Sequence, residues 1–198
     1  MGVTMIPALD CSRVVISVDP GLWDSGVAVW VRLDNNKCVL HWAGLVTLSK
    51  KTPREKAPRI MAERIFQTVF ECSPRAIFEW VIEYPQHYTA KRKTAEGVQT
   101  VIDVAEHLSA RVRGTTLAGE TAAMVRPSQW KGQLPKHIHH DRINQAITKK
   151  EVNRIDWPAP HLVHNVWDAV GIGLFYTKRH RRGGITPTQA KGTPCPDL

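Results

Sequence analysis

The chain has 198 residues, enough for one substantial core, and its 42% hydrophobic and 7% aromatic content is ordinary for a globular domain. Its 27 Lys and Arg residues outnumber its 18 Asp and Glu residues, and the formal net charge of +9 favours nucleic acid or another polyanion as partner. The four cysteines form no CxxC pair and no apolar run approaches the ~20 residues that span a bilayer, which argues against a zinc site, a disulfide framework and a membrane protein. We therefore expect a soluble, cytoplasmic protein without a signal peptide or transmembrane segment.

The first predicted element is a strand–turn–strand unit. Val14 to Val18 forms a β-branched run that leads to Asp19, the chain turns at Pro20-Gly21, and a second apolar run covers Gly26 to Val31. A carboxylate at the mouth of an apolar strand is costly to desolvate without a proton, a cation or a hydrogen-bond partner. Asp19 is either the start of a turn or part of a charged site.

A third strand and a helix follow. Lys37 to Leu48 is predicted to be a strand, joined to the second one by a polar hairpin tip, so that the first three strands form an antiparallel meander. From Pro58 the apolar period changes to that of a helix, with Met61, Ile65 and Val69 four residues apart. This helix is expected to cover one face of the sheet.

The next strand brings a second acid. Ala76 to Ile82 is apolar and leads directly to Glu83, which Tyr84-Pro85 follows. Two carboxylates at the ends of neighbouring strands repel each other unless one is protonated or a cation lies between them, so the pattern favours a divalent metal ion. A strand-end acid in solvent is the alternative for Glu83 alone.

Basic and aromatic segments follow on both sides of a helix predicted over Ala95 to Val112. A fifth strand is predicted over Thr121 to Val125, and a short helix over Asp141 to Lys150. The composition of the loops suits the gripping of phosphates and bases. The candidate substrate-binding residues are Tyr88, Lys91, Arg92, Lys93, Arg126, Trp130 and Lys136. His137, His139 and His140 form an HxHH run without companion cysteines, a weak metal signal, and are expected to face DNA or solvent.

The third acid lies in the last predicted helix, His161 to Thr177. His164 and Asn165 precede Asp168 by four and three residues, so the three polar side chains share one helix face. Val166 and Val170 belong to the opposite, apolar side. The pattern is typical of a site carried on a core-facing helix.

Four motifs in this order resemble the RuvC family of Holliday junction resolvases, within the RNase H-like superfamily. They are the DPG hairpin at Asp19, IEYP at Ile82 to Pro85, RPSQWKGQLPK at Arg126 to Lys136, and HNVWDAVGIG at His164 to Gly173. The resemblance covers about residues 13–178. It implies an α/β fold with a five-stranded mixed sheet, the first three strands antiparallel, flanked by helices. The expected division of the chain is an N-terminal extension (1–12), a nuclease domain (13–179) and a flexible basic tail (180–198).

The resemblance also implies roles for single residues. The family's metal-binding acids fall on Asp19, Glu83 and Asp168, and its basic residues near the scissile phosphate fall on Lys131 and Lys136. Where many members carry an acid or a histidine three residues before the last aspartate, this chain has Asn165. The fourth ligand is therefore either His164, which we prefer and which could instead be an acid–base group, or Asn165.

The implied activity is that of a crossover junction endodeoxyribonuclease, which cuts two opposite strands of a four-way DNA junction symmetrically. Three carboxylates can hold two Mg²⁺ or Mn²⁺ ions, and paired cuts call for a two-fold symmetric homodimer. The alternatives are an RNase H-like nuclease for other branched DNA or RNA–DNA hybrids, and a non-catalytic junction-binding protein. An actin-like ATPase is disfavoured, because its two-lobed fold needs a much longer chain.

Overall fold

A five-stranded mixed sheet forms the centre of the protein. In the computed structural model, residues 13–72, 76–86, 95–114, 121–132 and 135–179 are described. The strands are β1 (Arg13–Asp19), β2 (Asp24–Arg32), β3 (Cys38–Thr47), β4 (Ile77–Glu83) and β5 (Thr121–Val125). They lie in the order β3-β2-β1-β4-β5, with β1–β2 and β2–β3 antiparallel and β1–β4 and β4–β5 parallel. The predicted fold class is confirmed.

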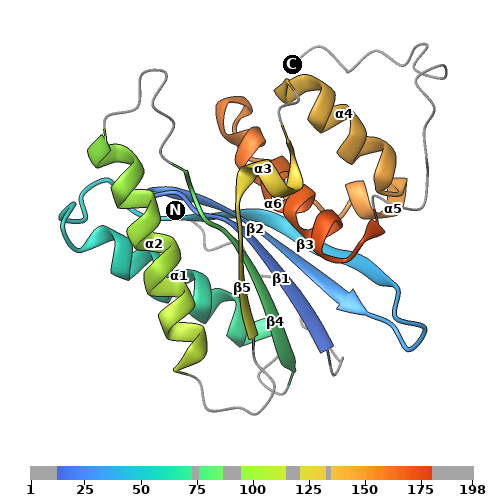
Figure 1. Cartoon of the computed structure of the whole chain (residues 1–198), viewed down its shortest axis with the longest axis horizontal. Coiled ribbons are helices and arrows are strands. Elements are labelled where there is room, and N and C mark those ends of the chain that lie inside the picture. The colour runs from blue at the N-terminus through green and yellow to red at the C-terminus, as the bar shows by residue number, and fades with distance from the viewer. Residues whose placement is uncertain (1–12, 73–75, 87–94, 115–120, 133–134, 180–198) are drawn as a thin grey trace.

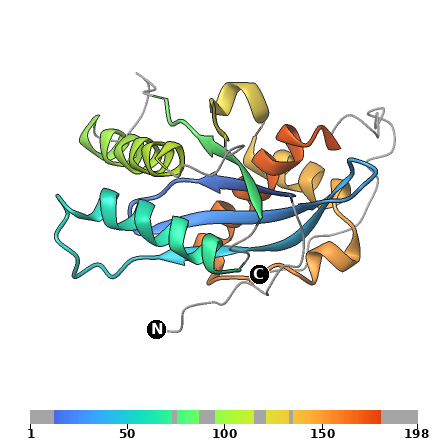
Figure 2. The ribbon, with the colours of Figure 1, turned by 90° about the horizontal axis from the view of Figure 1, so that it is seen from below.

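Helices cover both faces of the sheet (Figure 1). On one face, α1 (Ala57–Cys72) and α2 (Ala95–Arg113) lie side by side, as Figure 2 also shows. On the other face lie α3 (Pro127–Trp130), α4 (Lys136–Ala146), α5 (Lys149–Val152), the 3-10 turn Pro160–Leu162 and α6 (Val163–Tyr176). In the described part of the chain, no helix has both the length and the hydrophobicity needed to cross a bilayer.

The period-two alternation of β1 explains the two layers. Val14, Ile16 and Val18 are buried in the cluster beneath α1 and α2, whereas Val15 joins the cluster beneath α6. Alternate residues of a strand point to opposite faces, so Ser17 and Asp19 belong with Val15 on the α6 face. The buried Ser17 hydroxyl accepts a hydrogen bond of 3.0 Å from Nε1 of Trp30, which satisfies both polar groups in that core.

Helix α6 approaches the sheet at positions that have no side chain. A Cβ on Gly26 of β2 would lie 1.9 Å from the carbonyl oxygen of Asn165, and one on Gly173 would lie 2.1 Å from Nε1 of Trp30. Since real Cβ atoms do not come within 3 Å of other heavy atoms, these glycines set the close distance between α6 and the strands.

The region after β5 differs from the prediction. The expected helix over Asp141 to Lys150 is instead α4, which begins five residues earlier at Lys136, followed by the separate α5. Residues 136–140 carry no aliphatic stripe, so the sequence pattern concealed the first turns of α4. The boundary before α5 is set by Thr148, whose hydroxyl accepts a 3.3 Å hydrogen bond from the backbone N–H of Glu151 as an N-cap.

Candidate active site

Two acids lie at the ends of neighbouring parallel strands. Asp19 is the last residue of β1, and Glu83 is the last residue of β4. The register pairs Val18 with Ile82, so the two acids follow directly at the same edge of the sheet and on the same face. Glu83 is buried, with 7% of its surface exposed, while Asp19 is half-buried.

The third acid, Asp168, lies on the helix that covers this face. It is 5% exposed, and its neighbours Val166 and Ala169 pack into the core beneath α6. Asp168 is thus carried into a largely apolar layer by the packing of its own helix. A buried carboxylate in such a layer requires a charged or hydrogen-bonding partner.

Lys131 lies between two acids that come from different elements, Glu83 of β4 and Asp168 of α6. Its Nζ is 3.4 Å from Oδ2 of Asp168 and 3.8 Å from Oε2 of Glu83. Gly132, with a φ of 63°, turns the backbone immediately after Lys131, a conformation that glycine adopts without strain. The ammonium also lies 4.6 Å from the ring centroid of Trp130, a cation–π arrangement.

Trp130 holds Glu83 in place. The residue ends the short helix α3, its side chain is buried, and its Nε1–H donates a 2.7 Å hydrogen bond to Oε2 of Glu83. Helix α3 is closed at its start by Gln129, whose Oε1 accepts from the backbone N–H of Arg126 at 2.7 Å. The tryptophan predicted to contact substrate therefore presents its indole to the protein interior.

Burial and the mutual fields of these groups shift their pKa values. Burial raises the pKa of the Glu83 carboxyl, and the Lys131 ammonium and the Trp130 hydrogen bond offset this only in part. Burial alone would lower the pKa of Lys131, but the negative charges of Glu83, Asp168 and Asp19 outweigh it and raise that pKa. Lys131 is therefore charged at neutral pH, and Asp19 belongs to the same electrostatic cluster.

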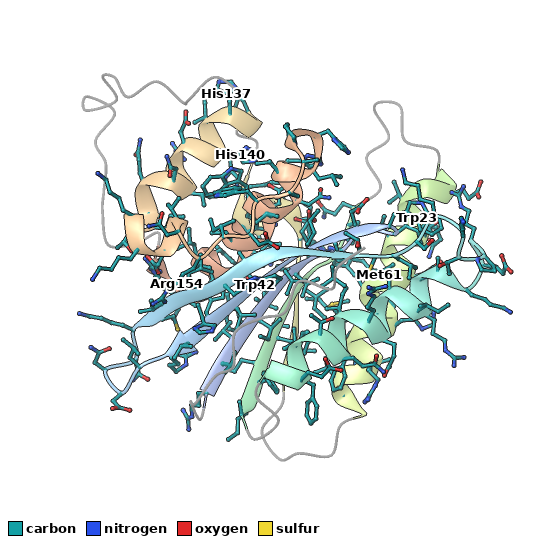
Figure 3. The ribbon with its side chains drawn as sticks, turned by 180° about the vertical axis from the view of Figure 1, so that it is seen from behind. Trp23, Trp42, Met61, His137, His140 and Arg154 are labelled. Atoms are coloured by element: carbon teal, nitrogen blue, oxygen red, sulfur yellow. The ribbon has the colours of Figure 1, made fainter. Side chains whose placement is uncertain are left out.

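Two histidines on α4 complete the site, and the sequence interpretation missed both. Nε2 of His140 lies 3.7 Å from Oδ1 of Asp168, and Figure 3 labels His140 on α4. His139 is buried and meets Trp130 edge to face, with ring centroids 4.9 Å apart. The expectation that this HxHH run faces DNA or solvent is wrong for His139, because the early start of α4 directs that ring into the core. His137, by contrast, is exposed.

The two candidates for a fourth ligand lie at the start of α6. Asn165 donates from Nδ2 to the carbonyl oxygen of Asp24 at 3.2 Å, which joins the helix to the beginning of β2. His164 is half-buried beside it. The amide of Asn165 thus has a structural contact, and the choice between the two residues stays a prediction.

For several predicted substrate-binding residues, the structure describes no contact with the carboxylates. Arg126 is exposed at the start of α3. Lys136 begins α4, but its side chain lies outside what the structure describes. Tyr88, Lys91, Arg92 and Lys93 also lie outside the described residues. Their proposed role in DNA binding stays a prediction.

The carboxylates of the site are suitable ligands for a hard divalent cation. In their present arrangement, however, they do not form a ready-made metal-binding group. Carboxylate oxygens are the ligands that Mg²⁺ and Mn²⁺ prefer. Among the described residues, no three His, Cys, Asp or Glu side chains form a group that could hold a metal ion as they stand. The ammonium of Lys131 lies against oxygens of Glu83 and Asp168 and is the cation that the structure places there.

Comparison with solved structures identifies the fold. Thermus thermophilus RuvC in complex with a Holliday junction substrate matches at a TM-score of 0.53 and 18% identity, over 86% of this chain and 97% of that one. The yeast mitochondrial Holliday junction resolvase matches at 0.51 and 13% identity, over 90% and 83%. The fowlpox virus resolvase in complex with Holliday junction DNA matches at 0.53 and 11% identity, over 84% and 97%.

Sequence comparison adds no closer relation, since no family model and no curated protein matches the chain. The shared features are the strand order, the antiparallel first three strands and the helices on both faces. The chain therefore has the RuvC-type, RNase H-like fold of the Holliday junction resolvases.

Proposed function

We propose that this protein is a metal-dependent endonuclease that resolves four-way DNA junctions by paired, symmetric phosphodiester cleavage. The observation that carries the proposal is the gathering of Asp19, Glu83 and Asp168, from β1, β4 and α6, around the ammonium of Lys131 on one face of a RuvC-type sheet. The fold neighbours include resolvases in complex with Holliday junctions, which supports the choice of substrate.

The acids are the groups that would hold the metal ions. Asp19, Glu83 and Asp168 would supply carboxylate oxygens, with His164 or Asn165 as a further ligand. Because the ammonium of Lys131 and a divalent cation compete for the same oxygens, binding of the ions requires Lys131 to move away from Glu83 and Asp168. Two Mg²⁺ or Mn²⁺ ions held there would supply charge stabilisation to the attacking and leaving oxygens of an in-line displacement.

The protein's own residues then bind and orient the phosphate. Lys131, once displaced from the acids, remains beside them and neutralises charge that develops on the phosphate. Trp130 keeps Oε2 of Glu83 in a fixed orientation through its 2.7 Å hydrogen bond, so we revise its role from substrate contact to positioning. His140 lies 3.7 Å from Asp168 and limits how far that carboxylate can turn.

The substrate and assembly follow from the chemistry of junction resolution. Two strands must be cut at symmetric positions, so we propose a two-fold homodimer with two active sites, and α2 is a candidate for its interface. Residues 13–179 would form the nuclease domain, with 1–12 as an extension and 180–198 as a basic tail. The basic residues at Lys91 to Lys93, Arg126 and Lys136 would contact the DNA backbone.

The test is cleavage of a synthetic four-way junction beside duplex, flap and RNA–DNA hybrid controls, with Mg²⁺ or Mn²⁺. We expect symmetric nicks on opposite strands, lost in Asp19→Asn, because the near-isosteric amide removes one negative charge from the site. Preferential cutting of the flap or the hybrid by the native protein would retain a nuclease and overturn the junction assignment.

A non-catalytic junction-binding protein is the second candidate. The observation that favours it is the contact of Lys131 with both Glu83 and Asp168, since an ammonium held there excludes a divalent ion. Tight junction binding without cleavage, and equal binding by native protein and Asp19→Asn in the presence and absence of Mg²⁺, would support this candidate.

A further inference from the structure

A row of aromatic rings leads from the candidate active site to the surface. Trp157, in the segment between α5 and the 3-10 turn, is 42% exposed, and its ring centroid lies 5.1 Å from that of Trp167. Trp167 in turn stacks on His140, with centroids 6.1 Å apart and an angle of 27° between the rings. Trp157 is thus the most exposed ring of the row, while Trp167 and His140 are half-buried.

The row is joined directly to the carboxylates. Trp167 precedes Asp168 on α6, and Nε2 of His140 lies 3.7 Å from Oδ1 of that aspartate. Two ring-to-ring steps therefore separate Trp157 from a residue in contact with the site. With ~3.4 Å between successive nucleotides of a stacked strand, a base a few nucleotides from a phosphate at the carboxylates can reach Trp157.

The surrounding chain has the charge of a nucleic-acid surface. Between Arg126 and His161 there are seven Lys and Arg residues against three Asp and Glu residues. One of those three acids, Glu151, is buried and paired with Arg179. The side chains of Arg142, Lys149 and Lys150 are exposed. Proteins that bind single-stranded nucleic acid commonly combine an exposed aromatic ring, on which a base stacks, with basic side chains that contact the phosphates, and this segment of the chain carries both kinds of residue.

We propose that Trp157, supported from beneath by Trp167 and His140, is a stacking platform for an unpaired base of the DNA strand that is cut. This inference rests on the proposed function and extends it to a specific contact. Opening of base pairs near the branch point makes such a base available, and a platform beside Asp168 holds it in a fixed position relative to the scissile phosphate.

The test uses full-length Asp19→Asn protein, so that the DNA stays intact, and four-way junctions with a fluorescent adenine analogue at successive positions near the cut. The emission of such an analogue falls when it stacks. We expect quenching at one position, lost in Trp157→Ala and largely kept in Trp157→Phe. Junction affinity should fall about 5- to 100-fold in Trp157→Ala, the range for one base–aromatic stack. The slope of log affinity against log salt should not change, because no phosphate contact is removed.

Ile77→Ala is the matched control. Ile77 is 40% exposed and begins β4, at the opposite end of that strand from Glu83, so its truncation should leave binding and quenching unchanged. The protein could bind junctions selectively while Trp157→Ala shows the same junction affinity and the same quenching as the protein with Trp157. That result overturns the stacking platform and leaves the proposed function standing. The same holds if Trp157→Ala lowers only the unfolding midpoint, since Trp157 would then pack against this chain itself. If the protein does not prefer junctions to duplex, the proposed function and the platform both fall.

Discussion

Lys131 dominates the electrostatics of the site. Its ammonium is charged at neutral pH because three carboxylates outweigh the cost of its burial. Glu83 differs, because burial raises the pKa of its carboxyl and only the Lys131 charge and the Trp130 hydrogen bond work against that. The ionised state of Glu83, on which the proposed metal binding would depend, is thus sensitive to its immediate neighbours.

Trp130→Phe tests this dependence. The phenylalanine keeps an aromatic ring but removes the N–H that donates to Glu83, so the pKa of Glu83 should rise further and its orientation should loosen. We expect the Mg²⁺ concentration for half-maximal junction cleavage to increase about 10- to 100-fold. The acid limb of the pH–rate profile should move to higher pH, because the ionised carboxylate then requires a more alkaline solution.

Trp42→Phe provides the control for the loss of ring volume. Trp42 is buried on β3 in the cluster beneath α1 and α2, away from the acids. Its substitution should lower the unfolding midpoint without moving the metal or pH dependence. Equal shifts in the two variants would contradict a positioning role for Trp130.

A second buried charge, Glu151, acts through stability. It accepts hydrogen bonds from the backbone N–H groups of Leu40 and Thr148, both at 2.8 Å, and pairs with Arg179. Burial alone would raise the pKa of Glu151, but the bonds from Arg179, Thr148 and Leu40 lower it to about 2. This one carboxylate therefore joins β3, α5 and the segment that follows α6.

Arg179→Met should lower the free energy of unfolding by about 2–4 kcal/mol at pH 7, because it leaves the charge of Glu151 buried without its partner. The folded pKa of Glu151 lies below its ordinary value of 4.5, so its stabilisation is present above pH 4.5 and is lost as the pH falls towards 2. The difference between native and variant should accordingly shrink in that range. Denaturant unfolding at pH 7, 4 and 3 measures it.

Arg54→Met is the control for charge removal. Arg54 pairs with Glu96 at 3.6 Å, and both side chains are more than half exposed. The expected change in the free energy of unfolding is within about 1 kcal/mol. A loss in Arg179→Met no larger than this would show that the Glu151 cluster contributes little to stability.

Among the secondary-structure elements, α6 links the candidate site to the core, because it carries Asp168 and closes one of the two hydrophobic clusters. Its apolar side chains pack in the cluster on that face of the sheet, and its glycines allow the close approach. Gly171 lies against Trp130 and His139, so that a Cβ there would be 2.6 Å from the Trp130 ring. The position of the helix and the position of the indole that binds Glu83 are therefore coupled.

Gly173→Ala tests the packing of α6. Its Cβ would meet Nε1 of Trp30 at 2.1 Å and Oγ of Ser17 at 2.7 Å, both buried. Alanine favours a helix over glycine by ~1 kcal/mol, but overpacking costs ~1–3 kcal/mol or more, so a net loss of stability is expected. Thermal unfolding measures it. Gly114→Ala, where the nearest atom to the new Cβ is at 3.4 Å, should leave the unfolding midpoint nearly unchanged. Similar midpoints for the two variants would contradict this account.

The whole molecule combines a largely buried sheet with an excess of basic residues over the chain. The net charge of +9 predicts DNA affinity that falls as salt rises, because each neutralised phosphate releases counterions. Residues 180–198 contribute Arg181, Arg182 and Lys191 to that charge. The two hydrophobic clusters draw on described residues before Arg179.

A chain that ends after Arg179 should keep its unfolding midpoint and its choice of cleavage site. Its affinity for duplex DNA should fall, and the slope of log affinity against log salt should decrease by up to about three, one for each basic residue removed. Filter binding over a salt series measures both quantities. A loss of cleavage at low salt would contradict the view that the tail adds only phosphate contacts.

The sequence by itself predicted the strands and pointed to three candidate acids, and the type of the sheet followed from the resemblance of its motifs to a known family. The strands and the acids rest on local periodicity and on acids that follow buried runs, so the positions of Asp19 and Glu83 at strand ends and the helix face of Asp168 were predictable. Only the tertiary structure decided which groups surround these acids. Lys131, Trp130 and His140 reach them from α3, α4 and the turn between, and these contacts cross 28 to 48 residues of chain. No short-range pattern encodes such contacts, because they depend on how α6 and the sheet pack, and a buried ring on α4 is indistinguishable in sequence from a solvated histidine.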